Sequence, residues 1–184
     1  MLGTSKLLTF AFRSLVVLPI IVIAWFSLAE PYDRALAAAA GPLLPDDAIV
    51  WELGAQLIYE HPVLPDTVAI DGLTLHFGLI LVSVLVLAAV GIGGTPRLAW
   101  LAAMVAGSFV LHVTVVTLLG HGLVWAAGPD SPEDSARLVL SLFAVFWGLI
   151  PPVVGGLWCF AYWLPRARVA EPVGPSLHQD LSPS

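Results

Sequence analysis

The sequence predicts an all-α membrane protein with four transmembrane helices and a small extracytoplasmic segment, for which we prefer a β-hairpin. Of its 184 residues, 59% are hydrophobic and 11% are charged, whereas a soluble domain carries about 25% charged residues. Four apolar stretches are long enough to cross about 30 Å of hydrocarbon. These stretches must be helical, because unpaired backbone groups are costly in lipid and four spans cannot close a barrel.

The predicted spans and the segments between them follow from this hydropathy pattern. The spans are 14–29 (with a start near residue 10 as the alternative boundary), 73–91, 98–125 and 138–164. Residues 1–13 form the N-terminal segment, and residues 30–72 and 126–137 form the two larger connections. The tail 165–184 is polar and rich in proline, a composition typical of disorder.

The charges predict the orientation of these spans. One side of the predicted membrane holds most of the basic residues, namely Lys6, Arg13, Arg97, Arg166 and Arg168. Most acidic residues lie in segments 30–72 and 128–137, on the other side. Because basic residues are retained in the cytoplasm, we expect both termini there. Abundant alanine, glycine and proline with little lysine suggest a bacterium, and hence a multi-pass protein of the inner membrane.

The first span has a second interpretation, as a cleaved signal peptide. Residues 1–13 resemble a basic leader region, and Ser27-Leu28-Ala29 fits a small-x-small cleavage pattern. Cleavage would leave three spans and an external N-terminus. We prefer the uncleaved anchor, because the apolar stretch is longer than that of a usual signal peptide if residues 10–12 are included.

The sequence of segment 30–72 predicts a short helix followed by extended strands. Pro31 suits a first helical turn and Gly41-Pro42 a helix end, so a short helix is expected at the membrane surface. Residues 48–60 then alternate between apolar and polar side chains, which is typical of a half-buried strand. A second extended run, TVAIDGLTLHF, follows the turn HPVLPD and offers a pairing strand. A helix from Asp47 is the alternative.

The apolar positions of the 48–60 run are candidates for binding a partner. They include Trp51, Leu53, Leu57 and Tyr59, which share one face if the run is a single strand. About 43 residues without a disulfide cannot easily bury a core of their own. We therefore expect segment 30–72 to pack against the bilayer surface, the helix bundle or another protein.

Inside the predicted spans, a few polar or helix-breaking residues form a candidate packing or functional site: Ser83, His112, Pro151 and Pro152. Ionisable residues at membrane depth usually face the bundle interior. The two prolines deprive the carbonyls of Trp147 and Gly148 of their helical partners, and a neutral His112 can donate to one of them. Ser83 is another possible partner of His112. We favour a structural role for His112 over a functional one.

Several classes of function are excluded or disfavoured. The net charge of −6 lacks the basic footprint of a nucleic-acid-binding protein. One cysteine excludes a disulfide framework within the chain and a multi-cysteine metal site. No phosphate-binding loop or Gly-x-Ser-x-Gly motif occurs. No acidic pair lies within the predicted spans, which argues against a proton-driven transporter. We therefore expect a protein that is not an enzyme and carries no cofactor.

A metal or haem subunit remains an alternative, built from His76, His112 or His121. His76 and His121 fall near the outer ends of their predicted spans, where Glu30 also lies. Imidazole suits iron, copper and zinc. Nothing in the spacing of these residues fixes such a site, because they come from different helices. A small lipid- or solute-handling protein, with a cavity near His112 and the prolines, is a further alternative.

The order of these parts resembles the exosortase H-associated membrane proteins of bacteria. The resemblance covers residues 10–164 and is carried by AWFSLAEPYDRALAAAAGPLL, DDAIVWELGAQLIY, IDGLTLHFGLILVSVLVLAA and GGTPRLAW. It implies an accessory protein encoded with an exosortase, a membrane enzyme that processes the sorting tails of exported proteins. Such enzymes use an outward-facing cysteine with arginine and histidine, whereas Cys159 is predicted near the cytoplasm. The resemblance thus implies a non-enzymatic partner of an exosortase-type integral membrane protein; the oligomeric state stays open.

Overall fold

The computed structural model describes residues 4–54, 56–132 and 134–169, and it does not describe the side chains of residues 4, 72–75, 148, 151 and 167–169. The chain forms helices joined to a three-stranded sheet. The elements are α1 (Thr4–Ala40), η1 (Gly41–Leu43), β1 (Ile49–Leu53), β2 (Gln56–Glu60), β3 (Val68–Asp71), α2 (Gly72–Ala88), α3 (Gly94–Ala126), α4 (Ser135–Trp158), η2 (Cys159–Trp163) and α5 (Leu164–Val169).

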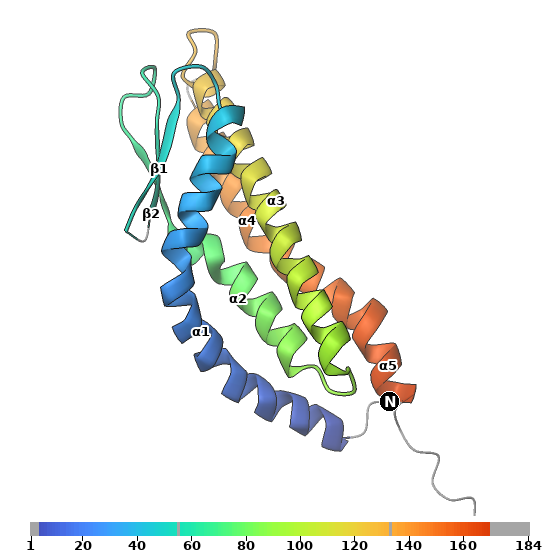
Figure 1. The fold of residues 1–184 in the computed structure, drawn as a ribbon. Coiled ribbons are helices and arrows are strands. Elements are labelled where there is room, and N and C mark those ends of the chain that lie inside the picture. Colours follow the sequence, from blue (N-terminus) through green and yellow to red (C-terminus); the bar gives the residue numbers. More distant parts are fainter. Residues whose placement is uncertain (1–3, 55, 133, 170–184) are drawn as a thin grey trace, which may run out of the picture.

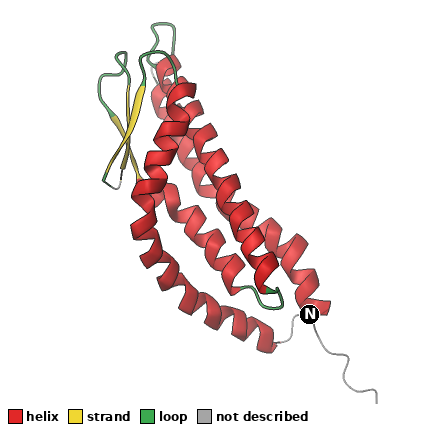
Figure 2. Cartoon of the chain, in the orientation of Figure 1, coloured by secondary structure: helices red, strands yellow, loops and turns green. Residues whose placement is uncertain are grey.

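The helices form an elongated bundle with the sheet attached at one end (Figure 2). α1 and α3 run toward the sheet end, whereas α2 and α4 run away from it, so that α5 and the start of α1 lie at the same opposite end (Figure 1). We call these the sheet end and the terminal end. This up-and-down arrangement is the one that the predicted order of spans requires.

Three helical segments are long and apolar enough to cross a membrane: Ser5–Leu43, Gly94–Ala126 and Ser135–Arg166. They make the chain compatible with a multi-pass membrane protein. The fourth predicted span, 73–91, corresponds to α2, whose apolar part His76–Ala88 is shorter than the other three. α2 lies in the interior of the bundle, because it buries side chains that include Leu79, Val82, Val84 and Val86.

α1 is one continuous helix of 37 residues. The sequence predicts a span ending at residue 29 and a separate surface helix from Pro31, but the structure contains no break between them. Proline removes one backbone hydrogen bond yet has a helical φ, so Pro19 and Pro31 bend the helix without ending it. α1 curves visibly along its length (Figure 1).

The chain also remains helical beyond the fourth predicted span. α4 continues through both prolines of the predicted site, then through one π-helical turn, η2, into α5. The expected disordered tail begins at residue 165, whereas the helix extends to Val169. Residues 170–184 lie outside the described residues. The helix therefore runs through both prolines, as the predicted span 138–164 requires.

The prediction of strands in segment 30–72 is confirmed, but their number is not. A single strand over 48–60 is wrong, because the run folds back on itself at Gly54 and forms the antiparallel pair β1–β2. Gly54 has a φ of +61°, a left-handed conformation that glycine adopts without strain. β3 pairs with the other edge of β2, giving the strand order β1-β2-β3.

This turn places the four candidate partner-binding residues on two different faces. Trp51 lies opposite Ile58 and Leu53 lies opposite Gln56. Since neighbouring residues of a strand point to opposite faces, Leu57 and Tyr59 face away from Trp51 and Leu53. Leu57 and Tyr59 are 0% and 2% exposed and belong to the core, whereas Leu53 is 63% exposed. The predicted common face does not exist.

The inner face of the sheet packs on α1 and α3 and forms the core of the sheet end. Its buried members are Leu36, Ala37, Ala40, Leu57, Tyr59, Ile70, Val116, Leu119, Leu123 and Trp147. The Tyr59 hydroxyl donates a hydrogen bond of 3.2 Å to the carbonyl of Gly120. Burial raises the pKa of Tyr59, so the phenol keeps the proton that this bond needs.

A second core closes the terminal end of the bundle. Its buried members are Val82, Val86, Ala89, Ile92, Trp158 and Trp163. The rings of Phe10 and Trp163 lie 4.6 Å apart and tie the start of α1 to η2. Arg97 donates to the carbonyls of Ala89 and Ile92 at 2.8 and 2.9 Å, which caps the end of α2.

Gly120 offers a direct test of how the sheet is held. A methyl group there would approach Leu44 Cδ2 at 2.7 Å and Tyr59 Cε2 at 3.0 Å. We expect Gly120→Ala to lower the free energy of unfolding by about 1–3 kcal/mol, as overpacking does. Gly107→Ala is the matched control, because it lies on the same helix with nothing within 4 Å. Circular dichroism can measure the melting temperature of each variant in detergent. Equal melting temperatures of the two variants would contradict this packing.

Candidate functional site

Polar and aromatic side chains from four helices meet beneath the sheet. Tyr32 and Asp33 come from α1, His76 from α2, His112 from α3 and Trp147 from α4. We call these five residues the polar cluster. Asp33, His76 and His112 are 0%, 1% and 2% exposed, and Trp147 is 6% exposed, so the cluster is enclosed by the rest of the chain.

One polar contact of the cluster joins α1 to α2. Nε2 of His76 lies 2.8 Å from Oδ1 of Asp33, so the imidazole N–H donates to the carboxylate. Removing a charged group from water costs several kcal/mol unless a well-placed partner compensates it. His76 is that partner for Asp33, 43 residues away in the sequence.

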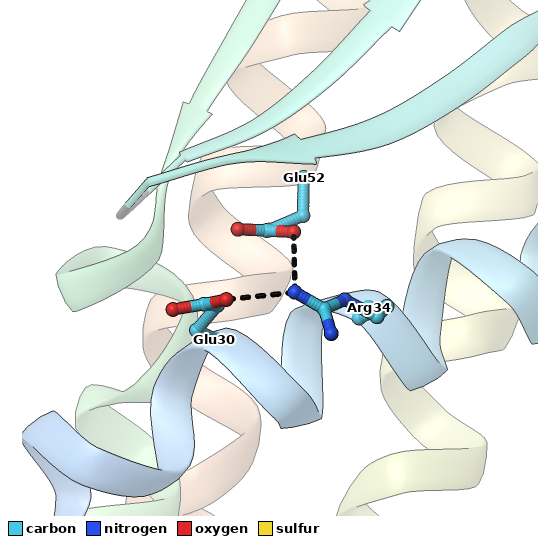
Figure 3. Close-up of polar contacts among 3 residues, drawn as sticks. All are labelled: Glu30, Arg34 and Glu52. Atoms are coloured by element: carbon cyan, nitrogen blue, oxygen red, sulfur yellow. Dashed lines mark hydrogen bonds and ion pairs between the residues drawn. The ribbon is translucent and has the colours of Figure 1, made fainter.

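The helical surface at this level separates buried from exposed charges. Asp33 points into the bundle, whereas its neighbours Glu30 and Arg34 form an exposed ion pair of 2.7 Å on the outside of α1. Arg34 also lies 3.7 Å from Glu52 of β1, as Figure 3 shows. Asp33 therefore contacts α2 through His76, whereas Arg34 contacts the sheet through Glu52.

Tyr32 and His112 connect α1 to the remaining helices. The Tyr32 hydroxyl and Nδ1 of His112 are 2.7 Å apart, a hydrogen bond in which the phenol donates when His112 carries its proton on Nε2. The other face of His112 packs on Trp147, with ring centroids 4.2 Å apart and an angle of 33°. These contacts extend the Asp33–His76 pair into a chain of contacts through all four long helices.

Aromatic rings surround the polar atoms. The Tyr32 ring meets His76 edge-on at 5.3 Å and Phe109 at 5.6 Å. Trp25 lies 5.1 Å from the His76 ring and 5.5 Å from Tyr32. Edge-to-face pairs of this kind each contribute about 0.5–1.5 kcal/mol beyond their buried area. The rings both fix the imidazoles and exclude solvent from them.

Two polar atoms of this region are buried without a hydrogen-bond partner among the described residues. They are Oδ2 of Asp33 and Nε1 of Trp25. Buried polar atoms are usually paired, so the Asp33 carboxylate holds unused acceptor capacity. The cluster joins α1 to α2 through the contact between Asp33 and His76. Neither Asp33 nor His76 is exposed to solvent in this structure.

The predicted intramembrane residues are only partly brought together. The structure pairs His112 with Tyr32 rather than with Ser83, which is buried on α2. The Trp147 ring packs against the His112 ring at 4.2 Å between centroids. Pro152 is exposed, and the side chain of Pro151 lies outside the described residues. His112 thus joins α3 to α1 through Tyr32, a residue that the sequence did not single out.

His112 also lines a cavity of about 230 Å³ between α2, α3 and α4. The other lining residues are Leu79, Val82, Ala103, Met104, Gly107, Ser108, Leu111, Ile150 and Val154. A larger apolar groove of about 410 Å³ lies between α3 and α4 toward the sheet end and shares Leu111 and Ile150 with this cavity. A ligand or a partner could lie in either of these two hollows among the described residues.

The histidines that the metal hypothesis groups together make separate contacts. His76 binds Asp33, and His112 binds Tyr32. Nε2 of the exposed His121 is 3.0 Å from the carbonyl of Leu43. No group of three or more His, Cys, Asp or Glu residues in the described part of the chain is placed to hold a metal ion. The geometry thus offers no support for a centre built from these three residues.

Sequence reasoning missed Tyr32 and Asp33, the central residues of the cluster. The sequence places Tyr32 in the short surface helix expected from Pro31, and Asp33 among the acidic residues of segment 30–72. One signal was present: in the run PYDRALAAAA, Asp33 has Leu36, Ala37 and Ala40 on the same side at helical spacing. An acid on the apolar face of an amphipathic helix requires a buried partner.

No family model, curated protein or solved structure matches this chain.

The contribution of the Asp33–His76 pair can be measured with a double-mutant cycle. We expect Asp33→Ala to lower the free energy of unfolding by about 3–5 kcal/mol, because it leaves His76 buried without its acceptor. His76→Ala should cost a similar amount, and the double variant should cost less than the sum. Glu30→Ala, on the same helix, removes an exposed pair and should cost at most about 1 kcal/mol. Additive effects of the two core variants would contradict an energetic coupling.

Proposed function

We propose that this chain is a non-enzymatic accessory protein of the bacterial inner membrane that binds another integral membrane protein. The observation that carries the proposal is the closed polar cluster. Its titratable residues contact one another across helices, at 2.8 and 2.7 Å, and line no route for a substrate to the Asp33 carboxylate. The open groove between α3 and α4 is largely apolar, which favours binding to another membrane protein over chemistry.

The distribution of charge supports an orientation with both termini in the cytoplasm. Three helices have the length and hydropathy of membrane spans. The terminal end of the bundle carries Lys6 and Arg13 on α1, Arg97 at the start of α3, and Arg166 on α5. The sheet end carries Glu52, Glu60 and most other acids. Under the positive-inside rule the sheet then lies outside the cytoplasm.

We infer that α2 is a fourth, interior span. Its 17 residues extend about 26 Å at 1.5 Å per residue, somewhat less than the hydrocarbon thickness of about 30 Å. A helix surrounded by other helices need not match the lipid, because its ends contact protein. α2 begins at the sheet and ends beside the terminal core, as a crossing helix would (Figure 1).

The groove between α3 and α4 is the proposed docking surface for a partner helix. Its lining is apolar apart from Thr114 and includes the exposed side chains of Leu118, Leu142 and Phe146. Helices associate in lipid chiefly through close van der Waals packing, for which a preformed groove provides area on two sides. The occupant proposed here is one apolar transmembrane helix.

The resemblance over residues 10–164 suggests which protein supplies that helix. It points to an exosortase-type membrane enzyme, which would carry the catalytic residues itself. The present chain would then position or stabilise that enzyme at the outer face of the membrane. This part of the proposal rests on the resemblance alone.

Co-purification from native membranes in a mild detergent tests the partner and the groove together. We expect the tagged chain to be recovered with a polytopic enzyme that has an outward-facing cysteine. Leu142→Trp and Leu118→Trp, which fill the groove, should reduce that recovery about tenfold if they remove about 1.4 kcal/mol of binding. Leu157→Trp is the matched control, because Leu157 is an exposed residue of α4 outside the groove lining.

The outcomes of this experiment separate the parts of the proposal. Recovery of the chain without another membrane protein would contradict the accessory function. Recovery of a partner with all three variants would instead contradict the groove as its docking surface. Equal melting temperatures of the variants would exclude misfolding as the cause of a lost partner.

A second function, the handling of a lipid or small solute, is favoured by one observation. The cavity of about 230 Å³ is lined mostly by apolar side chains but includes Ser108 and His112. This lining suits an apolar chain that carries one hydrogen-bonding group. Native mass spectrometry of the purified protein would reveal a retained lipid, and Gly107→Phe, which reduces the cavity, should abolish its retention. If Gly107→Phe retained as much lipid as the unchanged protein, the result would contradict this site.

A further inference from the structure

The outer face of the sheet is apolar along β1. Ile49, Trp51 and Leu53 alternate on this strand and point away from the buried Leu57 and Tyr59. Ile49 and Leu53 are 57% and 63% exposed, and Trp51 is half-buried. Ile58, opposite Trp51 in the register, is only 7% exposed. Adjoining exposed apolar side chains of this kind often mark a surface that contacts a membrane or another protein.

Contacts with α1 fix the height of this row along the bundle. Glu52 of β1 lies 3.7 Å from Arg34, which also binds Glu30 (Figure 3). Glu30 is the first charged residue of α1 after the apolar stretch that ends at Ala29. Leu53, next to Glu52, therefore lies beside the end of the most apolar part of α1.

The strand register gives a second and independent measure of the same height. Leu53 pairs with Gln56, and Gln56 pairs with Asp71 at the end of β3. α2 begins at the next residue, Gly72. The β1–β2 turn therefore lies at the level where the chain enters α2, whereas Ile49 and Glu60 lie at the other end of the sheet (Figure 1).

From these two measures we infer that the outer face of β1 lies in the extracytoplasmic headgroup region of the bilayer, with Leu53 deepest and Trp51 at the polar boundary. The inference rests on the proposed membrane-spanning function of α1. Tryptophan favours this boundary, because its ring is apolar and its N–H is polar. Glu52 does not oppose insertion, since its side chain points to the other face and is paired with Arg34. The occupant of this face is thus lipid, continuous with the lipid around α1.

Single-cysteine labelling tests this position. Cys159 is the only cysteine, so Cys159→Ser provides a cysteine-free background for the full chain. An environment-sensitive NBD label is attached at Leu53→Cys and, as a matched control, at Val63→Cys. Val63 is also exposed, at 52%, but lies in the connection at the far end of the sheet. A third label at Ile20→Cys, an exposed residue within the apolar stretch of α1, reports the span itself.

The labelled proteins are reconstituted in phosphatidylcholine vesicles, with and without lipids brominated near the headgroup or deep in the acyl chain. We expect the label at residue 53 to be blue-shifted and quenched by the shallow bromine. The label at residue 63 should be quenched only by aqueous iodide, and that at residue 20 by the deep bromine.

Each other quenching result would contradict a specific part of the proposal. Quenching at residue 20 by lipid, together with an iodide-accessible label at residue 53, would overturn this inference while leaving the span intact. No lipid quenching at residue 20 would overturn the membrane-spanning proposal itself. A label at residue 53 that is blue-shifted but insensitive to both quenchers would show that protein, a partner or a second copy, covers the face, and would also overturn the inference.

Discussion

A carboxylate with no exposure must find its partner within the protein, and this requirement organises the sheet end of the molecule. Asp33 is 0% exposed and binds His76 at 2.8 Å. The contact requires that α1 extend well beyond its apolar stretch, since Asp33 follows Glu30. It also requires that α2 begin near the same level, because His76 lies only four residues after Gly72, a rise of about 6 Å. Hydropathy alone does not fix the position of α1 relative to α2 along the bundle. The contact between Asp33 and His76 fixes it.

The position of the sheet follows from the same contact. Leu36, Ala37 and Ala40 lie one to two turns beyond Asp33 on the same side of α1 and form the surface on which Leu57, Tyr59 and Ile70 pack. β3 leads into α2 without a linker, so the height of His76 also sets the height of the strands. On the opposite side of the cluster, Tyr32 and His112 carry the connection to α3 and, through Trp147, to α4. Loss of the Asp33–His76 contact would therefore disturb the packing of every element of the sheet end.

Local patterns predicted much of this fold, and long-range pairing explains what they missed. Hydropathy identified the three long apolar helices, and alternation between residues 48 and 60 identified extended structure, because both are properties of neighbouring residues. The alternation could not reveal the turn at Gly54, since the apolar positions keep their spacing through it while the chain reverses and exchanges faces. Asp33 was missed for a related reason. Its partner is 43 residues away, and its immediate neighbours Glu30 and Arg34 are exposed, which makes the whole segment look like a surface.

The short length of α2 and the closed polar cluster can be understood together. If α2 faced lipid, its 17 residues would leave a mismatch with a bilayer core of about 30 Å, at a cost for each ångström. In the interior it contacts protein along most of its length, so its length is set by its two ends. One end is fixed by His76 at Asp33, and the other by Arg97, which binds the carbonyls of Ala89 and Ile92. These two polar anchors fix the position of α2 between the sheet and the terminal core. Because the first anchor also sets the level of the strands, a short α2 brings the sheet close to the apolar part of α1 rather than leaving it separated on a stalk.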